Sequence, residues 1–135
     1  MIRAALATAL TLAVPSPARA FTPDVDYAVH CQGCHLADGR ATPGSVPALA
    51  GTVARLARTP AGRDYMARVP NVAQAPLGDA ELAALLNWVV RRFAGPEAAA
   101  SFTPYGAEEI AKLRAEPLVD VQAARRALLP DSAAR

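Results

Sequence analysis

The sequence predicts an all-α protein, and three stretches carry that prediction. One begins after Gly78 and repeats apolar residues at the spacing of a single helix face: Leu82, Leu85, Leu86, Val89, Val90 and Phe93. Another starts at Thr59-Pro60, where a threonine N-cap precedes a proline in the first helical position. The third spans residues 108–116 and has helical composition.

The first twenty residues are predicted to be a secretory signal peptide. A basic start with Arg3 precedes an apolar run over residues 4–14, and Ala18-Arg19-Ala20 offers a cleavage site. The run is short for a membrane span, and a retained anchor is the alternative. Fourteen basic residues minus Arg3 and Arg19 leave twelve, against twelve acidic ones, so the mature chain is formally neutral. We expect an exported, periplasmic protein with no stable membrane span and no nucleic-acid partner.

The mature chain is organised around Cys31-Gln32-Gly33-Cys34-His35. This C-x-x-C-H spacing is typical of covalent c-type haem attachment. Each thiol adds to one vinyl group of the porphyrin, so both sulfurs must sit on one short, curved stretch of backbone. The imidazole that follows can bind the iron. The motif predicts one covalently bound haem c, with Cys31 and Cys34 as thioether anchors and His35 as the proximal axial ligand.

Three other uses of the two cysteines fit the sequence less well. A thioredoxin-type dithiol normally follows a strand, whereas residues 24–30 have no β-branched run and predict a short helix capped by Asp24 or Asp26. A structural zinc site needs four ligands. The chain has two cysteines and two histidines, and His30 and His35 flank the cysteines too closely for a tetrahedral shell. A disulfide would close a very small loop.

The central region is predicted to alternate short helices with irregular segments. Residues 36–44 are turn-rich and read as a loop. The expected helices cover residues 52–58, residues 60–67 and the stretch from Asp79 to the stop at Gly95-Pro96. Val69-Pro70 ends the second of these helices, and residues 71–77 are expected to be extended or irregular.

Several of these features together resemble the class I c-type cytochromes. The C-x-x-C-H motif is followed by a glycine-containing loop and then by Pro47-Ala48-Leu49-Ala50-Gly51, and the helix from Asp79 with Trp88 is similar to that family's closing helix. The resemblance implies a small cytochrome c-like haem domain over residues 21–95, with its N- and C-terminal helices packed around one haem. It also implies that the Pro47 carbonyl accepts a hydrogen bond from the proximal imidazole, which orients the ring.

The distal side of the iron is less well specified. The family usually supplies a methionine that is followed by proline, and Val69-Pro70 stands at that position here. Met66 is the internal methionine of the chain and the candidate distal ligand, because its unbranched thioether is adaptable. That role needs the helix from Pro60 to end early. Otherwise Met66 packs in the core, and the iron is five-coordinate or takes another donor.

Residues 96–135 form a C-terminal extension that the resemblance does not cover. Residues 97–101 are expected to be a linker, and helices are expected over 108–116 and 119–129. The extension either folds back on the haem domain or docks a partner protein. The function that follows is single-electron transfer between periplasmic redox proteins, a donor and an acceptor, with no catalytic residues in this chain. The alternatives are an electron-accepting subunit of a periplasmic dehydrogenase and an open-coordination haem protein that binds small ligands.

Overall fold

The computed structural model describes residues 21–42 and 46–130, so the predicted signal peptide over residues 1–20 lies outside the described part. Within these ranges the chain forms helices and no strand, which confirms the predicted fold class. In order, the helices are α1 (Pro23–His30), α2 (Gln32–His35), α3 (Val53–Ala57), α4 (Pro60–Arg68), α5 (Pro70–Ala73), α6 (Asp79–Phe93), α7 (Pro96–Ser101), α8 (Ala107–Arg114) and α9 (Val121–Leu128).

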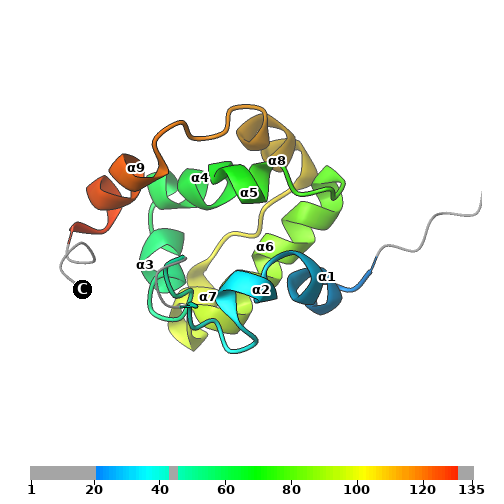
Figure 1. Ribbon diagram of the computed structural model, residues 1–135, viewed down its shortest axis with the longest axis horizontal. Coiled ribbons are helices and arrows are strands. Elements are labelled where there is room, and N and C mark those ends of the chain that lie inside the picture. Colours follow the sequence, from blue (N-terminus) through cyan, green and yellow to red (C-terminus); the bar gives the residue numbers. More distant parts are fainter. Residues whose placement is uncertain (1–20, 43–45, 131–135) are drawn as a thin grey trace, which may run out of the picture.

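Helix α6 is the element on which most of the others pack. It contacts α1, α3, α7 and α8, and it runs through the middle of the molecule in Figure 1. The apolar face predicted for it is buried, since Leu82, Leu85 and Val90 are each no more than 2% exposed. Burying side chains of this size contributes about 1.5–3 kcal/mol each to folding. The sequence pattern of α6 therefore identified the centre of the core correctly.

Local signals in the sequence set the starts of the helices. The Thr59 hydroxyl accepts a hydrogen bond from the Gly62 amide at 3.0 Å, as expected for the N-cap of α4. At the start of α6 the Gly78 amide donates to the Glu81 carboxylate at 2.8 Å, which is one half of a capping box. The Asp120 carboxylate caps α9 in the same way as Thr59 caps α4. These caps confirm the predicted starts of α4, α6 and α9 to within one or two residues. Helix α1 differs from its prediction, because it begins at Pro23 after Thr22, so neither Asp24 nor Asp26 is its N-cap.

Two segments that the sequence suggested were irregular are short helices. Residues 70–73 form α5, which overlaps the stretch 71–77 expected to be irregular. Residues 96–101 form α7, where a linker was expected. In both cases a proline that was interpreted as a stop for the preceding helix occupies the first position of the next one. Proline suits that position because its missing N–H would have no partner in the first turn.

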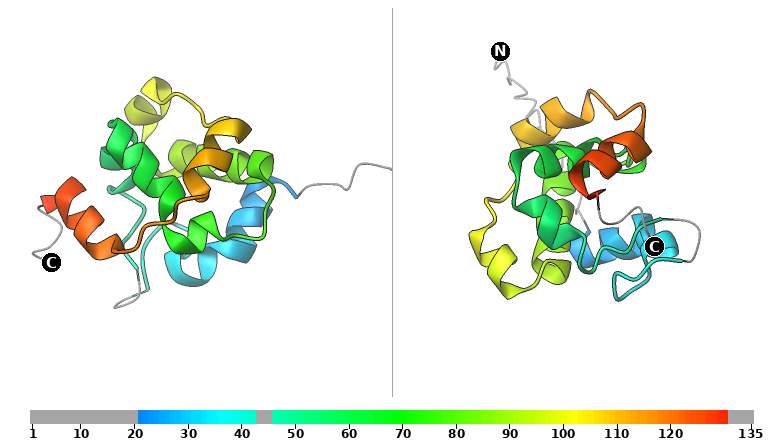
Figure 2. Two further views of the ribbon diagram at one scale, coloured as in Figure 1. Left: turned by 90° about the horizontal axis from the view of Figure 1, so that it is seen from above. Right: turned by 90° about the vertical axis from the view of Figure 1, so that its left-hand side faces the viewer.

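The C-terminal extension packs into the same core as residues 21–95. Ile110 and Leu129 are at most 1% exposed and belong to one apolar cluster with the residues of α6. Asn87 on α6 fixes the segment before α8, because its amide exchanges two hydrogen bonds with the backbone of Tyr105, at 2.7 and 3.1 Å. Figure 2 shows α8 and α9 lying against α4 rather than extending away from it.

Candidate functional site

The C-x-x-C-H motif lies at the sharp turn between α1 and α2. Cys31 separates the two helices, and its carbonyl accepts hydrogen bonds from the amides of Cys34 at 3.2 Å and His35 at 2.9 Å. The two cysteines are not bonded to each other. Cys31 is half-buried, and burial, followed by the nearby Asp26, raises its thiol pKa to about 11. Cys34 is exposed. One short helical turn thus presents both sulfurs and the imidazole.

Tyr27 holds this turn in place through its hydroxyl, and the sequence analysis did not identify it as a site residue. Its hydroxyl donates to the Leu36 carbonyl at 2.7 Å, one residue beyond the motif. Its ring packs against Trp88 and Phe93 of α6 at centroid distances of 5.1 and 5.4 Å. Burial raises its pKa to about 12, so it stays a neutral donor. The sequence feature that could have identified Tyr27 is its position four residues before Cys31, because residues four apart lie on the same face of a helix.

His35 is half-buried and turns one ring nitrogen towards Pro47. Burial lowers the pKa of His35, and the backbone of Pro47 partly offsets this. Because proline has no N–H, the contact involves its carbonyl oxygen. Nδ1 of His35 is fully buried and makes no hydrogen bond of good geometry with any described residue. The Pro47 carbonyl is thus a backbone acceptor close to the imidazole, and Nδ1 is a buried ring nitrogen without a well-formed hydrogen bond.

The segment that carries Pro47 is held against the motif through Gly39. The Gly39 carbonyl accepts from the Leu49 amide at 2.7 Å and from the Ala50 amide at 3.3 Å. Gly39 has a φ of +75°, and a Cβ there would come within 2.6 Å of the Phe93 ring. Both conditions demand glycine. The Thr42 amide also donates to the Cys34 carbonyl at 3.0 Å, which ties the loop back to the motif.

Met66, the candidate distal ligand, lies inside α4. That helix continues to Arg68 without an early end, and the Met66 side chain is 8% exposed and packs in the apolar core. Val69, one residue beyond the helix, is partly buried against the same core. The structure therefore brings Cys31, Cys34, His35 and Pro47 together and holds Met66 in the core.

Comparison with characterised proteins identifies the family. No family model matches the chain. It is 33% identical over 110 residues to "Cytochrome c-552" of Thermus thermophilus, an alignment that covers 68% of this chain and 84% of that protein. A second cytochrome c-552, from another strain of Thermus thermophilus, shows the same identity, with 74% of its length covered. The chain belongs to the c-type cytochromes. This family consists of electron carriers rather than enzymes.

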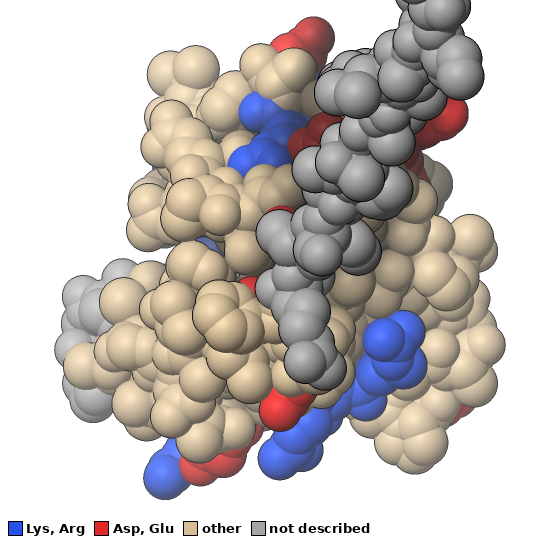
Figure 3. All heavy atoms as spheres, turned by 90° about the vertical axis from the view of Figure 1, so that its right-hand side faces the viewer, with Lys and Arg blue, Asp and Glu red and all other residues tan. Residues whose placement is uncertain are grey.

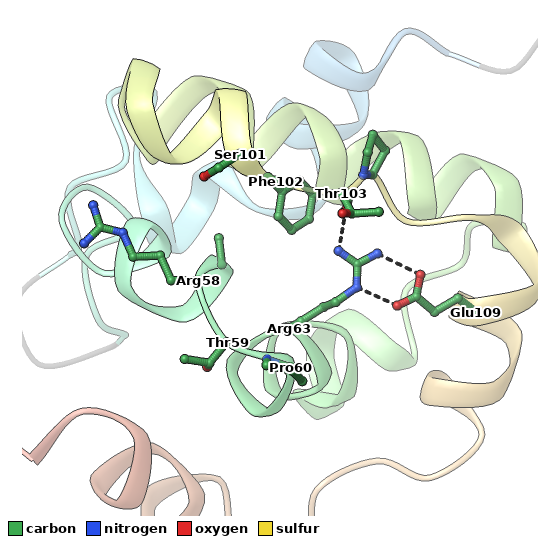
Figure 4. Close-up of a pocket in the computed structure, with 10 residues that line it drawn as sticks. Arg58, Thr59, Pro60, Arg63, Ser101, Phe102, Thr103 and Glu109 are labelled. Carbon is green, nitrogen blue, oxygen red and sulfur yellow. Dashed lines mark hydrogen bonds and ion pairs between the residues drawn. The ribbon is translucent and has the colours of Figure 1, made fainter.

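One hollow on the described surface of this cytochrome lies away from the motif. It has a volume of about 400 Å³ and opens between α3, α4 and the segment 101–104. None of the predicted site residues lines it. Figure 4 shows that the Arg63 guanidinium crosses it to meet the Glu109 carboxylate, at 2.6 and 2.8 Å, and the Thr103 carbonyl. The same guanidinium lies 3.9 Å from the centroid of the Tyr105 ring. The arginine thus joins α4 to the C-terminal extension.

The charged residues of this cytochrome show no large single-sign patch where the surface can be seen. On the visible part of the face in Figure 3, basic and acidic side chains lie close to one another and most of the surface is uncharged. Among the described residues, no helix combines the length and hydropathy that a membrane crossing requires. The same residues contain no cluster of three or more His, Cys, Asp or Glu side chains placed to hold a metal.

Proposed function

We propose that this chain is a class I mono-haem c-type cytochrome that relays single electrons between exported redox proteins. Cys31 and Cys34 would form the two thioether bonds, and His35 would bind the iron. The observation that carries the proposal is the turn between α1 and α2. It presents two unpaired thiols and an imidazole within five residues, in a chain that belongs to the c-type cytochromes.

The residues present fit a haem group. Its attachment requires two free thiols on one short stretch and an adjacent imidazole, and the turn supplies all three. An iron-binding histidine normally donates its other ring N–H to a carbonyl or carboxylate. The Nδ1 of His35 is buried without a well-formed hydrogen bond, and the Pro47 carbonyl lies close to the ring, so the pair matches that requirement. When bound, haem supplies a ferric/ferrous couple that carries one electron.

The surrounding residues would set the orientation and the environment of that group. The Pro47 carbonyl would hold the imidazole of His35 in one orientation and raise its basicity as a ligand. The hydrogen bond from Tyr27 to the Leu36 carbonyl keeps the turn after His35 in place. Partly buried apolar side chains, among them Leu49 and Val69, would limit the access of water.

Two arrangements of the distal side lead to different functions. Ligation by Met66 would give a sealed six-coordinate carrier. The continuous helix α4 and the burial of Met66 in the core favour the second arrangement, an open position at which small ligands such as carbon monoxide can bind.

In either case we propose periplasmic donor and acceptor proteins as partners, one of which is a dehydrogenase if the chain serves as its electron-accepting subunit. Contacts of such carriers are small and transient.

Covalent attachment can be tested in protein produced together with haem-maturation machinery. We expect wild-type protein to keep its haem absorption after denaturation and extraction with acidic acetone. The double variant Cys31→Ala/Cys34→Ala should lose it, and Gln32→Ala, a change between the two cysteines, should keep it. Wild-type protein without covalent haem would end the proposal.

The distal side is tested by ligand binding and by spectra. An open iron would bind carbon monoxide in the ferrous state without a slow phase, and Met66→Leu would leave the spectrum unchanged. A weak far-red band in the ferric protein that disappears in Met66→Leu would instead establish methionine ligation and the sealed carrier.

A further inference from the structure

Arg125 in α9 has an unsatisfied buried donor. Its Nε is fully buried and makes no hydrogen bond with any described residue. The position of Arg125 is fixed, because its carbonyl accepts from the Leu129 amide at 2.8 Å and the Leu129 side chain is 1% exposed. A buried donor without a partner costs about 1–3 kcal/mol. A ligand that supplies an acceptor to the Nε of Arg125 would remove this cost.

The Nε groups of the arginines that join the extension to the rest of the chain, Arg63, Arg68 and Arg114, all donate hydrogen bonds, so Arg125 is unlike them. Arg63 pairs with Glu109, and Arg114 pairs with Asp79 and with backbone carbonyls. Within the part of the chain that the structure describes, no carboxylate forms an ion pair with Arg125. A planar guanidinium with several donors is suited to bind a carboxylate through two parallel hydrogen bonds.

Tyr65 on α4 offers a second polar group within electrostatic reach of Arg125. Helix α9 packs on α4, and burial raises the pKa of Tyr65 while the charge of Arg125 lowers it by a smaller amount. Tyr65 remains a neutral phenol at physiological pH and can donate a hydrogen bond. The two side chains thus provide a positive fork and a neutral hydroxyl in one place.

The position of α9 relates this pair to the C-x-x-C-H motif. In both views of Figure 2, α2 and α9 lie on the same side of α6. The group proposed to be attached at α2 carries two carboxylates, its propionates. The C-terminal extension thus brings to this side a cation whose buried Nε has no hydrogen-bond partner.

We propose that Arg125, assisted by Tyr65, binds a haem propionate and thereby makes α9 part of the haem site. This inference rests on the proposed function. It assigns the extension a role within the chain itself, as a strap whose docking depends on the bound group. An adjacent cation destabilises the ferric state relative to the ferrous one, because the ferric state carries one more positive charge. Arg125 would therefore raise the reduction potential.

The test compares Arg125→Gln with Arg126→Gln in haem-loaded protein. Arg126 is the exposed next residue of the same helix, so both variants lose one positive charge from α9. The reduction potential should fall in Arg125→Gln, with the equilibrium shifting about tenfold towards the ferric state, or about 59 mV. In Arg126→Gln the same equilibrium should shift by less than twofold. Amide hydrogen exchange in α9 should accelerate at least tenfold in Arg125→Gln alone.

Further variants separate this role from a purely structural one. Arg125→Lys keeps the charge and should show less than half of the fall in potential seen in Arg125→Gln, and Tyr65→Phe should lower the potential by a smaller amount than Arg125→Gln. These two variants decide the question if Arg125→Gln does not accumulate. Equal potentials in wild type, Arg125→Lys, Tyr65→Phe and any Arg125→Gln protein would overturn the inference. The acid-acetone assay keeps this failure distinct, since protein without covalent haem would overturn the proposed function instead.

Discussion

Arg114 is the strongest single link between the C-terminal extension and the rest of the molecule, and its removal gives a sharp prediction. From α8 its guanidinium donates to the carbonyls of Ala73, Ala75 and Leu77 at 2.7–2.8 Å. It also meets the Asp79 carboxylate at 3.0 Å. These partners span the connection between α5 and α6. We expect Arg114→Ala to destabilise the folded protein substantially.

The magnitude follows from these contacts. A hydrogen bond to a charged group contributes about 1.5–3 kcal/mol, but contributions to one side chain do not add. The Asp79 carboxylate is 42% exposed, so that ion pair contributes at most about 1 kcal/mol. Gln74 and Pro76 of the connection are exposed, so water can reach part of the freed backbone. We expect a net loss of about 2–4 kcal/mol, or about 8–16 °C in Tm at roughly 4 °C per kcal/mol.

Thermal unfolding of haem-loaded protein, followed by far-ultraviolet circular dichroism, measures this loss. Lys112→Ala is the matched control, because Lys112 is a cation on the solvent side of the same helix and its removal should change stability by no more than about 0.5 kcal/mol. Arg114→Lys should lose about half as much as Arg114→Ala, since an ammonium cannot reach all of the acceptors at once. Equal Tm values for Arg114→Ala and Lys112→Ala would refute the reasoning.

Two further predictions concern the loop after the motif and the pairing across the surface hollow. Gly39→Ala should cost about 2–4 kcal/mol in chemical denaturation, because it adds a methyl group against Phe93 at a φ of +75°. Gly51→Ala, with a φ of +78° and open space, should cost only about 1 kcal/mol, and similar costs for both would contradict the clash. Hydrogen bonds from Arg63 hold the pKa of Glu109 below 4.5, so the Glu109 contribution to stability is complete above that pH and is lost as pH falls through the lowered value. Acid titrations of wild type and Glu109→Gln should therefore converge in stability at low pH, while Glu108→Gln should follow wild type throughout.

The features that the sequence predicted well are those encoded by neighbouring residues. The N-cap at Thr59 and the periodic apolar face of α6 depend on residues no more than four apart, and both are present in the structure. The turn at Cys31 to His35 is equally local. Proline was the exception among local signals. The same residue type can end one helix and begin the next, and Pro70 and Pro96 do both.

The contacts that the sequence did not reveal join residues far apart in the chain through backbone carbonyls. Arg114 bonds to carbonyls about 40 residues earlier, and Tyr105 exchanges hydrogen bonds with Asn87 across 18 residues. A carbonyl is present at every position, so no pattern of residue types marks it as an acceptor. The same holds for Tyr27 and the Leu36 carbonyl. The helical spacing around Ile110 predicted an apolar helix face, but it did not indicate which residues that face would pack against.

The two sides of the candidate site differ in the same way, because one is formed by local contacts and the other by long-range contacts. The proximal side is built from one continuous stretch, from Tyr27 to the segment around Pro47, so a short motif was enough to indicate its chemistry. In the proposed site the other side would be formed by α4, α5 and the extension, and the extension meets α4 and α5 through long-range contacts such as those of Arg114 and α9. Met66 and Arg125 both belong to this second set. Helix α4 fixes the first residue in the core, whereas the second has a buried donor that no described residue satisfies. Under the proposed function, α4 and the packing of the extension would together form the distal environment, and we expect variants in α8 and α9 to report on it more directly than variants within the motif.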